Sequence, residues 1–404
     1  MSAICSILST NSRRSSLYTT LRVASNRTGL RGITQVMSYR RIAFLLGIVC
    51  LSAAAATAQS RRVAPTPTPT PEEDTVRIRT EEIKLNVLAF DEKGEFYRDV
   101  TAKDLVITEN NVLHQPESVR RIPANVLIVM DTGGELRSVK SLDQTRRVAR
   151  AVVDALRPGD SVAVMTYADK PQIVGEWTSD KIQANAAIGR TNFGRKSLFV
   201  DGLKMATDFL TRSGLDNKHL ILITDGTDSL GRSSDKFDAL QRLMTTDITV
   251  HVLSYTSMEA AAIEPRTKST SNTPPPKAVP DEIQATLPNG VRDKGVKVGP
   301  TINMDRALLK TMRARQDDLE KAEKELEQVA ENTNGEFILP GTTDEMIEKA
   351  PLVARMIDSS YVVTYVPKAP VVESRGVAER NIEVTSKRDG LIVQARRKLL
   401  IAQK

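Results

Sequence analysis

The chain has 404 residues, with 57 Lys and Arg against 50 Asp and Glu, so its formal net charge is +7. Residues 1–58 hold seven arginines and no Lys, Asp or Glu, which leaves 50 basic and 50 acidic residues in the remainder. The positive charge therefore belongs to the leader and does not indicate a nucleic-acid partner. With only two cysteines and three histidines, the composition excludes a zinc ribbon, an iron–sulfur site and a multi-disulfide scaffold.

The N-terminal segment predicts export. Residues 37–58 combine the basic pair Arg40-Arg41, an apolar run and the small residues Ala56-Thr57-Ala58, which is the pattern of a secretory signal peptide. The apolar run is shorter than the roughly 20 residues that cross a bilayer, so we expect a mature chain without a membrane span, in the periplasm, outside the cell or at its surface. Residues 1–36 fit either a transit peptide or, as we prefer, a stretch upstream of a true start at Met37.

Two segments separate this leader from the main domain. Residues 59–74 include a Thr-Pro repeat, which predicts an extended, semi-rigid linker. Residues 75–122 alternate apolar and polar side chains and contain two turn signals, a pattern typical of a small β-rich N-terminal domain.

Strand-like and helix-like segments alternate over residues 123–358. Apolar runs predict strands at 125–130, 161–167, 172–177, 219–224, 248–255 and 336–339. Helical periodicity predicts helices at 141–156, 198–210, 237–244, 304–331 and 343–357. This order predicts an α/β fold with a doubly wound, mostly parallel sheet covered by helices.

The rest of the chain departs from this alternation. Residues 259–302 are rich in Pro, Ser, Thr and Asn and predict a mobile insertion without regular structure. Residues 359–404 predict a C-terminal β segment, in which strands at 382–385 and 392–395 form a hairpin around Arg388-Asp389-Gly390.

Candidate functional residues stand at the carboxyl ends of the predicted strands, where open α/β sheets place their binding sites. Asp131 and Asp225 each follow a buried strand, and Ser197 opens a helix between them. Two carboxylates and a hydroxyl at one edge suit a hard divalent cation. Either aspartate taken alone fits better as a cap of the turn or helix that follows it.

Several motifs occur together in one order. NVLIVMD, SVAVMTYAD, SLFVDGL and HLILITDG resemble a von Willebrand factor type A domain. VTAKDLVITENNVLHQPESV before them, and LEQVAENTNGEFILP, SSYVVTYVP and DGLIVQARRKLL after them, resemble the bacterial VWFA-related family of exported proteins. The resemblance covers residues 75–404, and it implies a non-enzymatic protein-interaction or adhesion module with an unidentified protein ligand.

The resemblance also implies a Mg²⁺ site, made by an Asp-x-Ser-x-Ser loop, a distant Thr and a late Asp. Asp131 and Asp225 match the first and last of these positions, and Ser197 stands at the Thr position. Both serines of the loop are replaced, by Gly133 and Glu135. The implied metal ligands of this degenerate site are thus Asp131, Glu135, Ser197 and Asp225.

Two outcomes remain open at this point. Glu135 can supply the missing oxygen, or Lys196 can neutralise the carboxylates and displace the ion. In a working site, the open coordination position takes a carboxylate from a partner protein. The partner-binding edge then includes Thr132, Gly133, Gly134 and Asp228, although Asp228 also fits a cap of its own loop.

The runner-up functions follow from the same residues. If metal binding has been lost, the chain is a structural cell-envelope protein. Residues 189–197 resemble a phosphate loop, but Arg195 is an extra residue before the lysine and a helix precedes the loop in place of a strand. A nucleotide-binding enzyme is therefore the least favoured reading, and we expect no catalytic activity.

Overall fold

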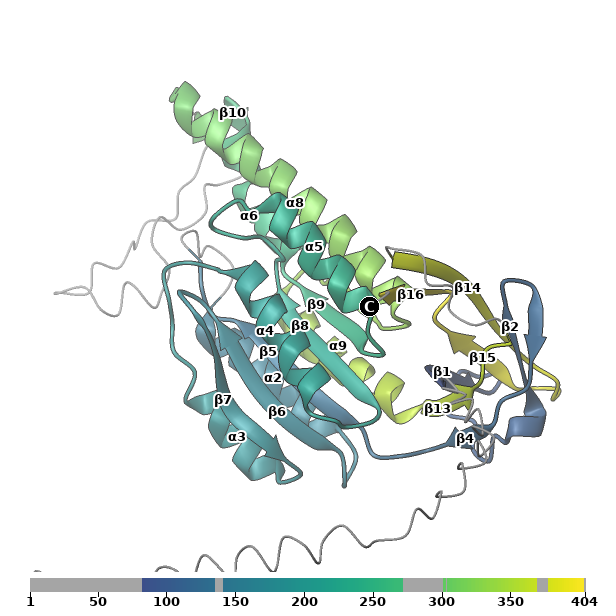
Figure 1. Cartoon of the computed structure of the whole chain (residues 1–404). Helices are drawn as coiled ribbons and strands as arrows, with labels where there is room; N and C mark the ends of the chain where they lie inside the picture. Colours follow the sequence, from purple (N-terminus) through teal and green to yellow (C-terminus); the bar gives the residue numbers. More distant parts are fainter. Residues whose placement is uncertain (1–81, 135–140, 272–300, 303, 369–376, 403–404) are drawn as a thin grey trace, which may run out of the picture. The chain divides into compact units, whose positions relative to one another are not determined.

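The computed structural model describes residues 82–134, 141–271, 301–302, 304–368 and 377–402 (Figure 1). The predicted upstream extension, signal peptide and Thr-Pro linker lie outside these ranges, as do Glu135 and most of the predicted insertion. None of the helices within the ranges is long and apolar enough to cross a membrane.

Six strands form the central sheet of the α/β domain, in the order β12-β9-β8-β5-β6-β7. The strands are β5 (Asn125–Asp131), β6 (Ser161–Tyr167), β7 (Pro171–Thr178), β8 (Lys218–Thr224), β9 (Thr249–Ser254) and β12 (Phe337–Ile338). All ladders are parallel except that between β6 and β7. The predicted mostly parallel α/β fold is confirmed.

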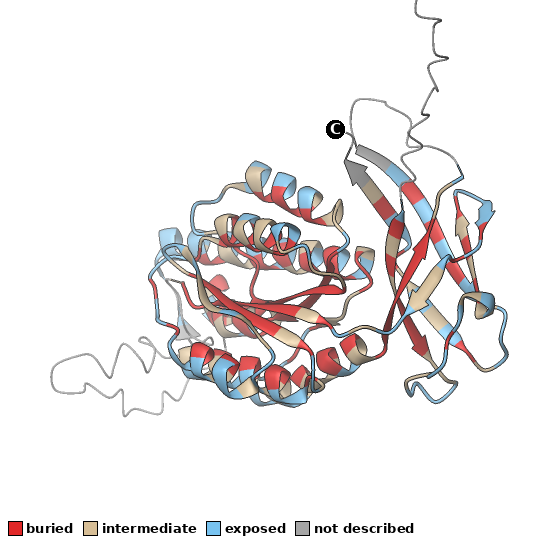
Figure 2. Cartoon of the chain, turned by 60° about the horizontal axis from the view of Figure 1, so that its bottom comes forward, coloured by how far each residue is buried: buried red, intermediate tan, exposed pale blue. Residues whose placement is uncertain are grey.

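Helices cover both faces of this sheet, because successive side chains of a strand point to opposite sides. Val126, Ile128 and Met130 of β5 pack with α2 (Leu142–Ala155), α3 (Lys181–Gly189) and α9 (Thr343–Asp358). Leu127 and Val129 pack with α4 (Phe199–Arg212), α5 (Ser233–Met244) and α8 (Arg306–Asn332). Figure 2 shows the consequence: the central strands β5, β6, β8 and β9 are buried, the edge strand β7 is only partly so, and the helices expose their outer sides.

The start of the predicted insertion is helical. The structure places α6 over Thr256–Thr267, so the expectation of irregular chain from residue 259 is wrong at its beginning. Ile263 of this helix is buried with Met312 and Leu319 of α8, and this packing outweighs the proline in the last turn of α6. Two short strands, β10 (Thr270–Ser271) and β11 (Thr301–Ile302), then pair with each other.

The N-terminal and C-terminal segments form one β structure. One sheet has the order β15-β1-β13-β4, and the other has the order β16-β14-β2-β3. Their strands are β1 (Ile83–Phe90), β2 (Leu105–Glu109), β3 (Val112–His114), β4 (Ser118–Arg120), β13 (Ser360–Tyr365), β14 (Val377–Ser386), β15 (Ile392–Ala395) and β16 (Lys398–Ala402). A short 3-10 helix, η2 (Ala102–Asp104), precedes β2.

The predicted hairpin at the C-terminus is wrong. β15 pairs with β1, whereas β14 pairs with β2 and β16. The turn signal at 388–390 is real, since Gly390 has a φ of 74°, but the chain crosses there from one sheet to the other. Leu105 and Ile107 from the N-terminal part share a core with Ile382 and Val384 from the C-terminal part. Neither segment completes this core alone.

Candidate functional site

Asp131 lies at the carboxyl end of β5 and is fully buried. Its Oδ1 accepts a hydrogen bond from the backbone N–H of Gly133 at 2.9 Å. Its Oδ2 accepts one from the hydroxyl of Ser197 at 3.0 Å. The carboxylate therefore organises the loop after β5 and also connects it to the residue that precedes α4.

Ser197 lies in the loop that the sequence predicted to approach Asp131. Its backbone N–H donates to Oγ of Ser229 at 2.8 Å, and the N–H of Ser229 donates back to the Ser197 carbonyl at 2.9 Å. Ser229 belongs to the loop after β8. The loops that follow β5 and β8 thus meet through Ser197.

Gly133 is required by close backbone packing. A Cβ atom at this position would lie 1.8 Å from the carbonyl oxygen of Lys196. Glycine at this position therefore does more than remove the hydroxyl that the resemblance implies here. It permits the loop after β5 to lie directly against the chain before Ser197.

Asp225 follows β8 and is 2% exposed. Its Oδ1 accepts hydrogen bonds from the backbone N–H and the hydroxyl of Thr227, at 2.8 and 2.7 Å. Its Oδ2 lies 3.3 Å from Nη2 of Arg315. Asp225 thus caps the turn that follows it, as the sequence analysis considered, and also forms an ion pair with Arg315 that the sequence did not predict.

Arg315 comes from α8, and the sequence analysis missed it together with Glu259 of α6. Nη2 of Arg315 donates to Oε2 of Glu259 at 2.8 Å, and Nη1 donates to Oγ1 of Thr227 at 2.6 Å. Burial opposes the charge, but Asp225 and Glu259 outweigh it and raise the pKa of Arg315. No sequence pattern predicts this contact, because it depends on how α6 and α8 pack.

Tyr167 lies beneath the site at the end of β6. Its hydroxyl is 2.5 Å from Oγ1 of Thr224. Burial raises the pKa of Tyr167 well above its usual range, and the charges of Asp131 and Asp225 raise it further. Both aspartates thus lie near enough to Tyr167 for their charges to act on its phenol.

The remaining residues of the predicted partner-binding edge have structural contacts. Thr132 is 2% exposed; its N–H donates to the Tyr167 carbonyl, and its own carbonyl accepts from Gly194 N–H, both at 3.1 Å. Gly134 has a φ of 130°, a conformation that favours glycine.

Asp228 caps α4. Its carboxylate accepts hydrogen bonds from the N–H groups of Val200 at 3.0 Å and Leu230 at 2.9 Å, and it pairs with Arg232 at 2.9 Å. Although burial opposes ionisation, these hydrogen bonds and the Arg232 charge lower the pKa of Asp228. Both carboxylate oxygens of Asp228 thus accept capping hydrogen bonds, as the capping alternative predicts.

The described residues do not fit a hard divalent cation. Within the described ranges, no group of three or more His, Cys, Asp or Glu side chains could hold a metal. Gly133 offers no side-chain oxygen, and a guanidinium lies on Asp225 where a cation would bind. Lys196, considered above as the neutralising group, is not the residue that makes this contact.

The segment that resembles a phosphate loop binds a carboxylate of the same chain. The N–H groups of Arg195 and Lys196 donate to the carboxylate of Asp169, at 3.2 and 2.9 Å. These two hydrogen bonds, led by that of Lys196, lower the pKa of Asp169. The backbone donors that would receive a phosphate already hold a carboxylate of the same chain.

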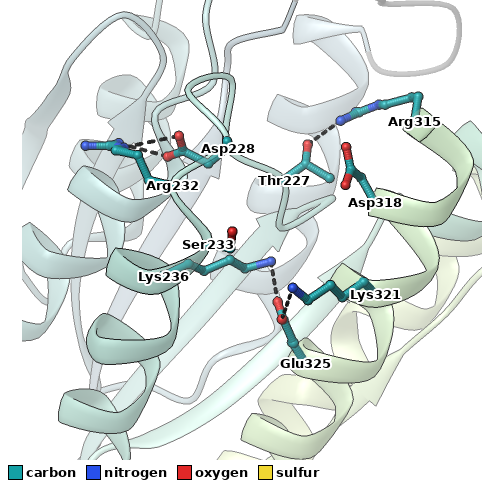
Figure 3. A pocket seen from close by; sticks show the side chains of 10 residues that line it. Thr227, Asp228, Arg232, Ser233, Lys236, Arg315, Asp318, Lys321 and Glu325 are labelled. Atoms are coloured by element: carbon teal, nitrogen blue, oxygen red, sulfur yellow. Dashed lines mark hydrogen bonds and ion pairs between the residues drawn. The ribbon is translucent and has the colours of Figure 1, made fainter. Parts of the chain in front are cut away.

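A pocket of about 120 Å³ opens next to Asp225 (Figure 3). Thr227 and Arg315 line it together with charged residues from the loop after β8, from α5 and from α8, namely Asp228, Arg232, Lys236, Asp318, Lys321 and Glu325. Figure 3 shows Lys236 and Lys321 directed at the Glu325 carboxylate, to which their Nζ atoms lie 2.5 and 3.8 Å away. The pocket is thus polar, and Arg232, Lys236 and Lys321 are paired with acidic side chains of the same pocket.

Comparison with known proteins identifies the central domain. Residues 126–227 match the von Willebrand factor type A domain family. None of the curated protein sequences compared with the chain matches it.

Solved structures similar to the chain come from several organisms. A von Willebrand factor type A protein from Catenulispora acidiphila has a TM-score of 0.39 and 11% identity, over 81% of this chain and 75% of that one. An aerotolerance-related membrane protein from Bacteroides fragilis has a TM-score of 0.34 and 16% identity, over 57% and 98% of the two chains. Manganese-loaded TRAP protein from Plasmodium vivax has a TM-score of 0.34 and 10% identity, over 72% and 97%.

Proposed function

We propose that this chain, which contains a von Willebrand factor type A domain over residues 126–227, is an exported protein-binding module of the cell envelope. Type A domains act as protein-interaction or adhesion modules, and the signal-like segment at 37–58 supports export. The proposed binding surface is the carboxyl edge of the central sheet.

The observation that carries this proposal is the convergence of three loops at that edge. Asp131, Ser197 and Asp225 come from separate parts of the sequence: Ser197 donates to Asp131, its N–H donates to Ser229 in the loop that also carries Asp225, and both aspartates lie near the phenol of Tyr167. Open α/β sheets bind their ligands where such loops meet. The adjoining pocket gives the edge a recess that a partner side chain can enter.

The histidines support a non-enzymatic role. His219 and His251 are buried at the start of β8 and within β9, and they bond to each other. His114 lies in β3, where its Nδ1 donates to the Val112 carbonyl. All three histidines of the chain therefore have structural partners in strands, and none follows the end of β5 or β8, where Asp131 and Asp225 lie.

The second candidate function is a structural envelope protein whose type A domain does not use a metal. The ion pair between Arg315 and Asp225 favours this candidate over a metal-assisted adhesin. The two candidates differ in whether the sheet edge itself contacts the partner.

Lys321→Glu tests the edge, because Lys321 lines the pocket and its side chain is 63% exposed. Lys349→Glu is the matched control, on α9 with a 43% exposed side chain. We expect cross-linking in intact cells to identify partners of the wild type that Lys321→Glu loses and Lys349→Glu keeps. Equal retention of those partners by both variants would assign the contact to another surface and favour the structural role.

A further inference from the structure

Arg315 and two carboxylates form a buried ionic cluster at the sheet edge. The side chains of Asp225 and Glu259 are 2% and 4% exposed, and that of Arg315 is 24% exposed. The same nitrogen, Nη2, lies 3.3 Å from Asp225 and 2.8 Å from Glu259. One guanidinium therefore joins the end of β8 to α6.

Arg315 supplies these two carboxylates with one of the two positive charges that a divalent ion would bring. Buried carboxylates are stable only when a cation or several hydrogen bonds compensate them. A guanidinium is planar, permanently charged and able to donate in several directions at once, which suits it to hold two carboxylates and a hydroxyl together. Its Nη1 makes the third of these contacts, with Thr227 at 2.6 Å.

The position of Arg315 is fixed by the helix that carries it. Met312 and Leu319 of α8 are buried with Ile263 of α6, and Leu326 of α8 is buried against the sheet. Since both helices are held in this way, the guanidinium is supplied by a rigid part of the fold. Leu326 also occupies the space next to Gly226, where a Cβ would lie 2.6 Å from its Cδ1.

We propose that Arg315 replaces the divalent cation at this edge, so that the domain is held in its binding conformation without metal. Removal of the positive charge at residue 315 then turns Asp225 and Glu259 into a site with affinity for hard cations. The proposal concerns the ion dependence of the domain and is independent of which partner it binds.

The test compares Arg315→Gln with wild type by thermal unfolding in EDTA and in 5 mM MgCl₂ or MnCl₂. We expect the wild-type Tm to change by less than about 1 °C on addition of either ion. Arg315→Gln should unfold at lower temperature in EDTA and recover by at least about 3 °C with Mn²⁺. Lys310→Gln, with the same charge change at an exposed position of α8, should behave like wild type.

A wild-type Tm that rises with Mg²⁺ or Mn²⁺, or a folded Arg315→Gln variant that responds to neither ion, would overturn the proposal. If Arg315→Gln does not fold, Arg315→Lys and direct Mn²⁺ binding decide the question. The proposal then requires that Arg315→Lys folds without an ion response and that the Mn²⁺ electron paramagnetic resonance signal is unchanged by wild-type protein. These measurements need no partner, so their failure is distinct from failure of the proposed function.

Discussion

Nδ1 of His219 lies 3.1 Å from Nε2 of His251, and the two rings stack with centroids 5.4 Å apart. The N–H of Glu336 donates to Nδ1 of His251, so that Nε2 of His251 carries the proton and donates to His219. The other nitrogen of His219 donates to Oδ1 of Asn217 at 3.0 Å. Both imidazoles are thus neutral, and their hydrogen bonds fix one tautomer for each.

This pair predicts a loss of stability in mild acid. Burial lowers the pKa of His251 to about 3, and burial, together with the repulsion that His251 and Arg157 exert on a protonated ring, lowers the pKa of His219 well below its usual value. The unfolded state takes up both protons below about pH 6.5, whereas the folded state does not, so stability falls as pH decreases from there. In urea unfolding between pH 7.5 and 5, the loss should be small above pH 6.5 and approach about 1.4 kcal/mol per pH unit for each histidine below it.

The control for this prediction is the double variant His219→Gln with His251→Gln, which cannot titrate at these positions. It should be less stable than wild type at pH 7.5 but show a smaller slope between pH 6.5 and 5. An unchanged slope would mean that other groups cause the acid sensitivity.

Gly133→Ala should destabilise the domain by about 2–4 kcal/mol, because the new Cβ would overlap the Lys196 carbonyl oxygen at 1.8 Å. Gly189→Ala is the control: its Cβ would meet only the end of the Arg150 side chain at 3.4 Å, so a change within about 0.5 kcal/mol is expected. Chemical unfolding of both variants checks the prediction. Equal stabilities would show that the loop after β5 can move away at little cost.

Ser197→Ala should reduce stability by about 1–3 kcal/mol, because it removes the hydroxyl that donates to the buried carboxylate of Asp131. Ser197→Thr retains a hydroxyl and should lose less. Differential scanning calorimetry of the two variants measures the difference. A threonine variant as unstable as the alanine variant would indicate that packing, and not this hydrogen bond, matters at the position.

Truncation after residue 376 should unfold the β structure. It removes β14, β15 and β16, and with them the buried side chains of Ile382, Val384, Leu391 and Leu399. At about 1.5–3 kcal/mol for each side chain, the loss exceeds 5 kcal/mol and exposes β1 and β2. Limited proteolysis should then cleave within Leu105–Glu109.

A contrasting variant for this truncation is Lys398→Ala. It removes an ion pair with Glu379 in which both side chains are about half exposed, and it should change stability by less than about 1 kcal/mol. Protection of Leu105–Glu109 in the truncated chain would contradict the shared core.

The sequence predicted the α/β domain well, because its strands are continuous apolar runs and its helices are amphipathic. The sequence was enough to predict that Asp131, Ser197 and Asp225 lie close together, because the carboxyl ends of parallel strands share one edge of the sheet. Arg315 could not, because its contact with Asp225 spans 90 residues and depends on helix packing. The start of α6 was missed because Pro265 and the composition after it favour an irregular segment.

The C-terminal pairing was missed for a related reason. Local turn chemistry at Arg388-Asp389-Gly390 indicates a reversal of the chain but not which strands become neighbours. Register in β1 and β2 is set by partners about 300 residues away, such as Ala395 opposite Val87. The alternation within β1 and β2 indicates which side chains are buried but not which strands become neighbours.

The shared β core also determines when its strands can pair during synthesis. β1 lies between β13 and β15, so its pairing is complete only after the ribosome has made residues 360–395. Until then, its apolar face and unpaired edge are open to other chains. A chain that stops before β13 and β15 therefore leaves both edges of β1 without their partner strands.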